Sequence, residues 1–384
     1  MTNKLNVLPM TADVDPLVID DLRERLSRRR LSRLDDDGER GISGPWLEEL
    51  LEDWKGLNGT TFPHSTSGLT HLSANIDGQR VHLAMAEGRG PNPTPLLLCN
   101  GWPSSFYEYL DVLPLLTDPA AHGGTAQDAF TVVIPTMPGF GFSAPPPPGG
   151  LTAAQIGELW HTLMTEGLGF DRFVAHGSDL GAGVVPQLAR AHPRSVAGIH
   201  LASPAVPLPP RPWSPAIELY AKEVETWAAE EGSYAHQHAT KPDTIGVALQ
   251  DSPAGLAAWI GEKVVAWSSP DPDGRPAFPR DLLLANLTLY WATGTIATSM
   301  LPYWKYRHTP SAALPIDDPS SVPTSVSLFG GERVPFPRLP RELAERYFSV
   351  TSWDDHETGG HFPAAATPEL FAETLRLAFR ETRR

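Results

Sequence analysis

The segment 172–184 constrains this 384-residue chain more than any other stretch. It reads Arg-Phe-Val-Ala-His-Gly-Ser-Asp-Leu-Gly-Ala-Gly-Val. The apolar run from Phe173 to Ala175 predicts a buried strand, and residues 184–191 predict a helix that ends before Pro193. A strand, a sharp glycine-flanked turn and a helix, in that order, are typical of a nucleophile elbow. The segment therefore predicts a reactive side chain at the crest of a strained turn.

The glycines of this turn indicate which residue stands at its crest. Such a turn holds its central residue at strained backbone angles, so the residues two before and two after must be small. With Asp179 at the centre these residues are Gly177 and Gly181, whereas centring the turn on Ser178 would put a histidine and a leucine there. The candidate nucleophile is therefore a carboxylate, Asp179. The alternative at this point is an ordinary glycine-rich turn with a solvated aspartate.

Composition narrows the class of partner. A hydrophobic share of 41% is that of a globular chain, and the net charge of -15 disfavours nucleic acid and anionic membranes. The single cysteine, Cys99, excludes an internal disulfide and fits a reducing compartment. Residues 1–10 lack the apolar segment of a signal peptide, and no apolar run approaches a membrane span. We expect a cytoplasmic protein with a neutral or weakly polar substrate.

Apolar runs of strand length alternate with helical patterns along much of the chain. This alternation predicts an α/β fold with a mostly parallel sheet and crossover helices on both faces. The expected strands are 81–86, 95–99, 129–134, 173–175, 196–201, 324–329 and 347–353, and the expected helices include 16–34, 46–54, 152–168 and 368–380.

Changes in composition and in the pattern of expected helices and strands divide the chain into four parts. Residues 1–75 carry no catalytic motif and are interpreted as a meander packed on the core and the cap. Residues 76–206 and 321–384 are expected to form two parts of one sheet-containing core. Residues 207–320 are rich in Trp, Tyr and Pro with helical segments, which predicts a helical cap inserted late in the chain.

A carboxylate at the elbow requires an acid and a histidine, which follow the nucleophile in that chain order. Glu332 comes after the expected strand 324–329, and His361 lies in the loop before the last helix. Both positions fall at the carboxyl ends of strands, where the sites of such sheets assemble. Surface-loop roles are the alternatives. The rival acids for the position of Glu332 are Asp317, Asp318, Asp354 and Asp355.

The turn Asn100-Gly-Trp-Pro103 directly follows the expected strand 95–99. A turn here can aim the backbone N–H of Trp102 at the elbow, and with the N–H of Leu180 it would form an oxyanion hole. A plain Gly-Pro turn is the alternative. The histidines lack partners at metal-ligand spacing, and the chain contains no phosphate-binding loop, so no metal site is expected.

On these residues the chain resembles the epoxide hydrolases of the α/β-hydrolase fold, and within them the microsomal-type branch. The resemblance covers nearly the whole chain. Its most specific stretches are 234–244 with 251–256, 289–296, 323–332 and 359–362. It implies that Tyr234 and Tyr303 are the phenols that activate the epoxide, that Glu332 is the charge-relay acid and that His361 is the base. Tyr290 and Tyr306 are close to Tyr303 in the sequence and are alternatives for the second phenol.

The resemblance implies conversion of an epoxide and water to a vicinal diol through an ester on Asp179. Trp102, Leu180 and Phe362 are expected to line the substrate pocket. No cofactor is implied, the expected partner is a small-molecule epoxide, and a homodimer is compatible with this interpretation. Detoxification and secondary-metabolite biosynthesis are both open as roles.

Three departures from the family pattern bear on these expectations. Asn100 stands where the family usually has His, Leu180 stands where many relatives have Trp, and the membrane-anchor helix of some relatives is not found. The runner-up is a haloalkane dehalogenase, which also uses an Asp nucleophile; Leu180 counts against it, because a Trp there often binds the halide. A catalytically dead binding protein is the third alternative, and the set of Asp179, Glu332 and His361 argues against it.

Overall fold

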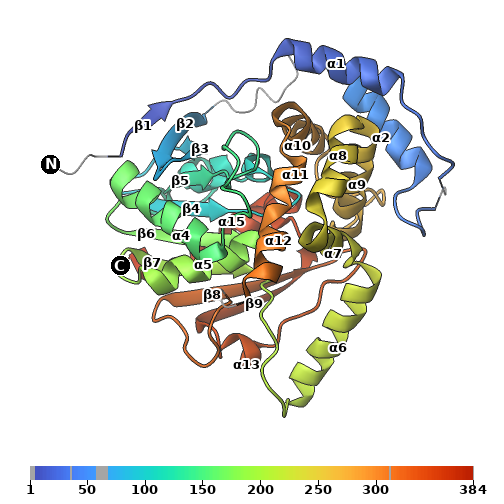
Figure 1. The fold of residues 1–384 in the computed structure, drawn as a ribbon. Helices are drawn as coiled ribbons and strands as arrows, with labels where there is room; N and C mark the ends of the chain where they lie inside the picture. Colours follow the sequence, from blue (N-terminus) through green and yellow to red (C-terminus); the bar gives the residue numbers. More distant parts are fainter. Residues whose placement is uncertain (1–4, 35–36, 58–67, 311–312, 384) are drawn as a thin grey trace.

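The fold is built around a nine-stranded sheet, seen in a computed structural model that describes residues 5–34, 37–57, 68–310 and 313–383 (Figure 1). The strand order is β1-β2-β3-β5-β4-β6-β7-β8-β9. All pairs from β5 to β9 are parallel, and the three pairs from β1 to β5 are antiparallel, which confirms the mostly parallel sheet. The strands are β1 (Val7–Pro9), β2 (Thr70–Ile76), β3 (Gln79–Ala86), β4 (Thr94–Cys99), β5 (Phe130–Pro135), β6 (Phe173–Ser178), β7 (Val196–Ala202), β8 (Pro323–Gly330) and β9 (Ser349–Gly359).

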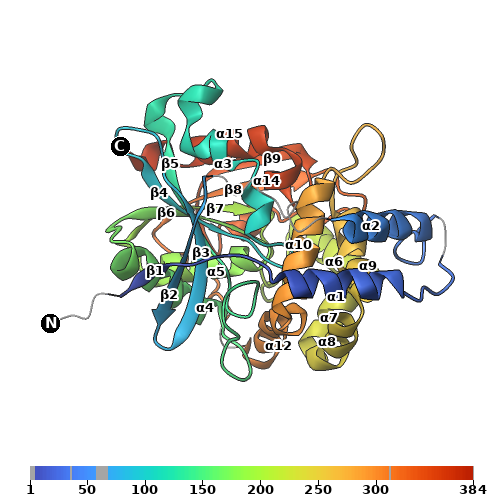
Figure 2. The same cartoon turned by 90° about the horizontal axis from the view of Figure 1, so that it is seen from above.

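Helices cover both faces of the sheet, which buries its central strands. Helices α4 (Ala153–Thr162) and α5 (Leu180–Ala191) lie on one face, and α3 (Leu113–Thr117) and α15 (Pro368–Ala378) lie on the other (Figures 1 and 2). Every residue of β6 is buried, as expected for a strand covered on both sides. The sequence pattern of short apolar runs therefore reflects the two-sided burial of a parallel sheet.

The segment between β7 and β8 forms the cap, and its described part is helical. Within it the structure has only an isolated bridge, between Pro270 and Pro276, in place of strands. The cap lies beside the carboxyl end of β6, where Trp102 of the core stacks on Tyr234 of the cap. Its helices are α6 (Pro215–Glu230), α7 (Ser233–Thr240), α8 (Pro242–Asp251), α9 (Pro253–Trp267), α10 (Arg280–Thr293), α11 (Ile296–Ser299) and α12 (Leu301–His308).

The N-terminal segment connects the sheet to the cap. Strand β1 pairs with β2 at the sheet edge, whereas α1 (Pro16–Ser27) and α2 (Gly44–Gly56) run along the outer side of α8 and α9 (Figure 1). Helix α1 ends at Ser27, so the expected helix 16–34 was too long. At this end of the helix the guanidinium of Arg29 donates to the carbonyl oxygen of Leu26 at 2.9 Å and so caps the last turn.

Candidate active site

Asp179 stands at the crest of the turn between β6 and α5, as the glycine pattern predicts. Its φ of 51° lies in the left-handed region that side chains rarely adopt. A Cβ atom on Gly177 would come within 2.4 Å of the carbonyl oxygen of Gly181, and one on Gly181 within 1.8 Å of the carbonyl oxygen of Cys99. Only glycine fits at either position, which is the steric condition for this turn.

Two backbone N–H groups converge on one oxygen of the Asp179 carboxylate. Oδ1 accepts a hydrogen bond from Trp102 N at 2.9 Å and another from Leu180 N at 2.7 Å. The approach requires a glycine at position 101, because a Cβ there would lie 2.0 Å from Oδ1. A negative oxygen at this point would be stabilised by both donors, which is the geometry of an oxyanion hole.

Cap and core together fix the loop that supplies Trp102. From α10, Asn286 Nδ2 donates to the carbonyl oxygen of Pro103 at 2.7 Å, and the Tyr290 hydroxyl donates to that of Ser104 at 3.3 Å. Asn100 is buried and its Nδ2 donates to the carbonyl oxygen of Gly101 at 3.1 Å. The residue that departs from the family pattern therefore binds the backbone of its own loop.

His361 lies beside the second oxygen of the Asp179 carboxylate. Its Nε2 is 3.3 Å from Oδ2, which is ion-pair distance, although the angle is not that of a hydrogen bond. The ring packs against Trp267 at 4.9 Å and Phe362 at 5.0 Å between centroids. Burial alone would lower the pKa of His361, but the neighbouring Asp179 charge, with smaller contributions from Glu108 and Glu332, raises it above its ordinary value.

Glu332 follows β8 and is half-buried near His361. Burial raises the pKa of Glu332, and the nearby His361 and Arg338 act in the opposite direction. No hydrogen bond joins Glu332 to His361, and the buried Oε1 of Glu332 has no hydrogen-bond partner. The interaction between the two side chains is therefore electrostatic in this structure.

The rival acids are placed differently from Glu332, because all four are exposed to solvent. Three of them form ion pairs with arginines, namely Asp317 with Arg346, Asp318 with Arg190 and Asp355 with Arg338.

Tyr234 of α7 and Tyr303 of α12 lie together against Trp102. Their ring centroids are 5.9 Å apart, and those of Trp102 lie 5.2 Å from Tyr234 and 6.4 Å from Tyr303. Burial, and next the Asp179 charge, raise the pKa of both phenols, so both stay protonated beside the carboxylate. The hydroxyl of Tyr303 is buried and has no hydrogen-bond partner.

Of the two alternative tyrosines, one has its hydroxyl in a hydrogen bond and the other is exposed to solvent. The Tyr290 hydroxyl donates to the Ser104 carbonyl oxygen, and Tyr306 is 64% exposed. Of the expected pocket residues, Trp102 and Phe362 are buried in the aromatic cluster around His361 and the phenols, and Leu180 is half-buried at the start of α5.

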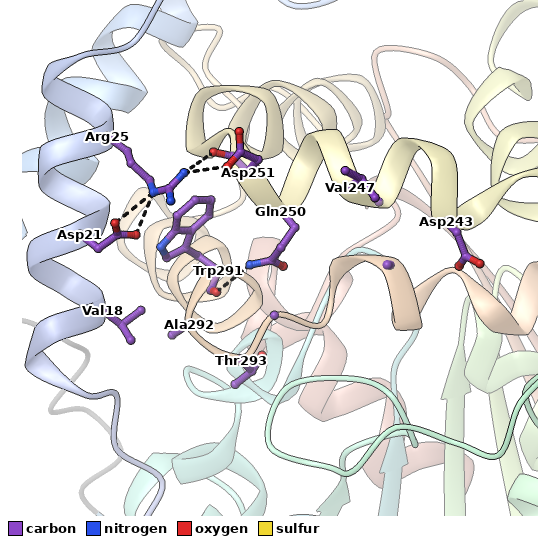
Figure 3. Close-up of a pocket in the computed structure, with 13 residues that line it drawn as sticks. Val18, Asp21, Arg25, Asp243, Val247, Gln250, Asp251, Trp291, Ala292 and Thr293 are labelled. Atoms are coloured by element: carbon purple, nitrogen blue, oxygen red, sulfur yellow. Dashed lines mark hydrogen bonds and ion pairs between the residues drawn. The ribbon is translucent and has the colours of Figure 1, made fainter.

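A groove of about 770 Å³ lies elsewhere, between α1, α8 and the end of α10. Figure 3 shows Arg25 of α1 between Asp21 and Asp251, with the Trp291 ring below it. None of the residues that line it belongs to the cluster around Asp179. The groove marks the junction of the N-terminal helix with the cap, and the candidate chemistry lies in the closed aromatic cluster.

Within the described residues, no group of three or more His, Cys, Asp or Glu side chains is arranged to hold a metal ion. Across the same part of the chain, each helix is too short or too polar to traverse a lipid bilayer.

Comparison with known proteins identifies the family. Residues 7–109 match the family described as "Epoxide hydrolase N terminus", and residues 94–242 match "alpha/beta hydrolase fold". A Stigmatella aurantiaca protein with the provisional name of epoxide hydrolase is 36% identical over 98% of this chain and 86% of its own length. The chain belongs to the epoxide hydrolase family.

Further proteins are similar to this chain over most of their length. Epoxide hydrolase 1 of Sus scrofa is 30% identical over 97% of this chain and 88% of its own. The crystal structure of juvenile hormone epoxide hydrolase from Bombyx mori superposes with a TM-score of 0.85 at 28% identity, covering 98% of this chain and 95% of that one. This chain is therefore a hydrolase of the α/β-hydrolase fold.

Two buried polar residues of this epoxide hydrolase were missed by sequence reasoning. Glu108 is buried near His361 and Asp179, and burial raises its pKa to about 7, against a smaller opposing effect of a Ser104 hydrogen bond. His238 contacts Trp102 and both phenol rings. A signal existed for Glu108, since it is the one charged residue in the apolar run 106–110. None existed for His238 in a cap segment of mixed polarity.

Proposed function

We propose that this chain converts an epoxide and water to a vicinal diol through a covalent ester on Asp179. The observation that carries the proposal is that the two oxygens of the Asp179 carboxylate have different partners. Oδ1 is held by two backbone N–H groups, Oδ2 has no backbone donor and faces His361, and two protonated phenols lie near it across the cap boundary.

In the first step Oδ2 of Asp179 attacks a ring carbon and the carbon–oxygen bond of the epoxide breaks. Oδ1 keeps its hydrogen bonds to Trp102 N and Leu180 N and becomes the carbonyl oxygen of the ester. A serine nucleophile would leave an ether, which water does not readily cleave, whereas a carboxylate leaves an ester whose carbonyl belongs to the enzyme.

Tyr234 and Tyr303 hold the departing oxygen and supply its proton. Both phenols have raised pKa values, so both are donors at neutral pH. An alkoxide is a stronger base than a phenolate, so one phenol gives up its proton as the ring opens, and the other stabilises the charge by its hydrogen bond. The unpartnered Tyr303 hydroxyl is available for this contact.

In the second step His361 removes a proton from water, and that water attacks the ester carbonyl. Esterification removes the negative charge of Asp179, whose contact with the imidazole raises the pKa of His361, so the pKa falls and the neutral imidazole is favoured at the stage that needs a base. The oxyanion forms at Oδ1 between Trp102 N and Leu180 N, where each donor contributes about 3 kcal/mol. The proton that the imidazolium loses on esterification returns to the phenolate. Collapse of the tetrahedral intermediate breaks its bond to the diol oxygen, which takes the hydroxyl proton that came with the water, so the diol leaves and the Asp179 carboxylate is restored.

One turnover in heavy-oxygen water tests the ester. With enzyme in excess over an epoxide such as styrene oxide, the first diol is expected to carry no solvent oxygen, and mass spectrometry should find the label in the peptide that contains Asp179. Direct attack of water on the epoxide would put the label in the first diol and refute the ester. Incubation with a haloalkane is the control, because halide release would favour a dehalogenase.

A further inference from the structure

His238 is a buried histidine at the contact of the two proposed phenols. It lies on α7 one turn after Tyr234 and is 0% exposed. Its ring centroid is 4.7 Å from Trp102, 5.1 Å from Tyr303 and 5.5 Å from Tyr234, with interplanar angles of 82°, 75° and 85°. No other histidine among the described residues contacts both phenols.

The hydrogen bond that His238 accepts determines which of its nitrogens carries the proton. The indole Nε1–H of Trp259, on α9, donates to His238 Nε2 at 3.1 Å. An indole nitrogen is a donor only, so Nε2 must offer a lone pair, and a neutral imidazole then carries its hydrogen on Nδ1. Burial lowers the pKa of His238 to about 3, which keeps the ring neutral.

The Nδ1 atom of His238 is buried and has no hydrogen-bond partner within the described structure. A buried unpaired donor costs about 1–3 kcal/mol, so it calls for an explanation. Three of its four aromatic neighbours meet the imidazole nearly at right angles, which is the arrangement of an edge against a ring face; the fourth, Trp259, is tilted at 44°. An imidazole edge wedged among Trp102 and two phenols limits the positions that those rings can take.

We propose that His238 is a positioning residue for epoxide ring opening, held by Trp259 as a neutral imidazole that wedges Trp102, Tyr234 and Tyr303 into place. The inference rests on the proposed function, because it assigns no separate chemistry to His238. It adds a third group, buried behind the two phenols, that determines how they point.

A neutral ring at this place is required by the chemistry of the phenols. An imidazolium in contact with both would favour the phenolate and remove the proton that ring opening needs. Lys263 lies over Tyr234 with its Nζ 5.3 Å from the ring centre, and it is paired with Glu231 at 3.0 Å and Glu262 at 2.8 Å. The positive charge over the Tyr234 ring is therefore balanced by two carboxylates.

The kinetic test separates the two chemical steps. We expect His238→Phe, which keeps a ring but accepts nothing from Trp259, to slow ester formation about tenfold or more and to leave ester hydrolysis within about twofold of the parent. His238→Gln should restore most of the rate, since its amide oxygen can accept the indole N–H. His236→Phe, an exposed position on the same helix, is the matched control and should change neither step.

A spectroscopic test does not depend on turnover. Nitrogen-15 NMR of the resting enzyme should find His238 protonated on Nδ1 alone from about pH 5.5 to 8.5, and Trp259→Phe should abolish this fixed tautomer. Protonation of both nitrogens near pH 6, or a hydrogen on Nε2, would overturn the proposal. So would ester formation at the parental rate in folded His238→Phe, or an equal loss in both steps.

The outcomes of these experiments also distinguish the positioning role of His238 from the proposed function on which it rests. If the parent enzyme forms no ester, the proposed function and the positioning role of His238 are both refuted. If the parent forms the ester and only the His238 results disagree, the proposed function stands and the positioning role is wrong.

Discussion

His361 Nε2 lies 3.3 Å from Oδ2 of Asp179, on the carboxylate oxygen that receives no backbone hydrogen bond. The carboxylate thus has one oxygen directed at the N–H groups and one at the imidazole. The same pair serves both proposed steps, because the carboxylate that attacks the epoxide also raises the pKa of His361 and so favours its protonated form until the attack is complete.

Removing the base should trap the covalent intermediate. We expect His361→Gln to form the Asp179 ester at a rate near that of the parent and to hydrolyse it about 10²–10⁴-fold more slowly. Intact-protein mass spectrometry after mixing with an epoxide should then show a stable adduct. His356→Gln, a half-buried histidine earlier on β9, is the control and should turn over normally. Failure of His361→Gln to accumulate any adduct would contradict the assignment.

Removing a phenol should affect the opposite step. Tyr234→Phe and Tyr303→Phe should each slow ester formation about 10²-fold, since each loses one hydrogen bond to the departing oxygen. Pre-steady-state fluorescence would measure the rate. Tyr306→Phe, exposed on the same helix as Tyr303, should have no effect. A loss in Tyr306→Phe equal to that in Tyr303→Phe would mean that the wrong phenol has been chosen.

The ionisation of His361 should depend on the charge of Asp179. The pKa of His361 is raised in the resting enzyme against the effect of its burial, so the cation is favoured there. In Asp179→Asn that support is lost and the pKa should fall, which favours the neutral base. NMR titration of both proteins checks the direction. The rate of ester hydrolysis should likewise titrate below the resting-state pKa. An unchanged pKa in the asparagine variant would be inconsistent with this coupling.

The two glycines that flank the strained turn, Gly177 and Gly181, should tolerate no side chain. Gly181→Ala puts a methyl group 1.8 Å from the carbonyl oxygen of Cys99 and is expected to destabilise the fold by more than about 3 kcal/mol. Gly183→Ala, two residues on in α5, meets nothing within 4 Å and should stabilise by about 0.5–1 kcal/mol through helix propensity. Thermal unfolding of the two variants compares them, and equal midpoints would refute the steric argument.

Local constraints explain how much of the site could be predicted from the chain. The choice of Asp179 over Ser178 follows from two glycines within five residues, and the structure gives Asp179 the positive φ that they permit. The strands could be predicted from the sequence because burial on both faces of the sheet selects continuous apolar runs. The C-terminal end of α1 could not be predicted, because Arg29 caps the helix through a side-chain contact that the spacing of apolar residues does not reveal.

The sequence by itself therefore determined the strands from β3 to β9 and the crest of the turn, since these depend on sterics or burial that short segments of the chain express. Only the tertiary structure decided which tyrosine packs beside Tyr234, and that His238 contacts both rings. Those contacts join α7, α9 and α12 to the loop of Trp102, and they depend on which faces of separate helices are buried together. Helix periodicity leaves that choice open until the cap has packed on the core.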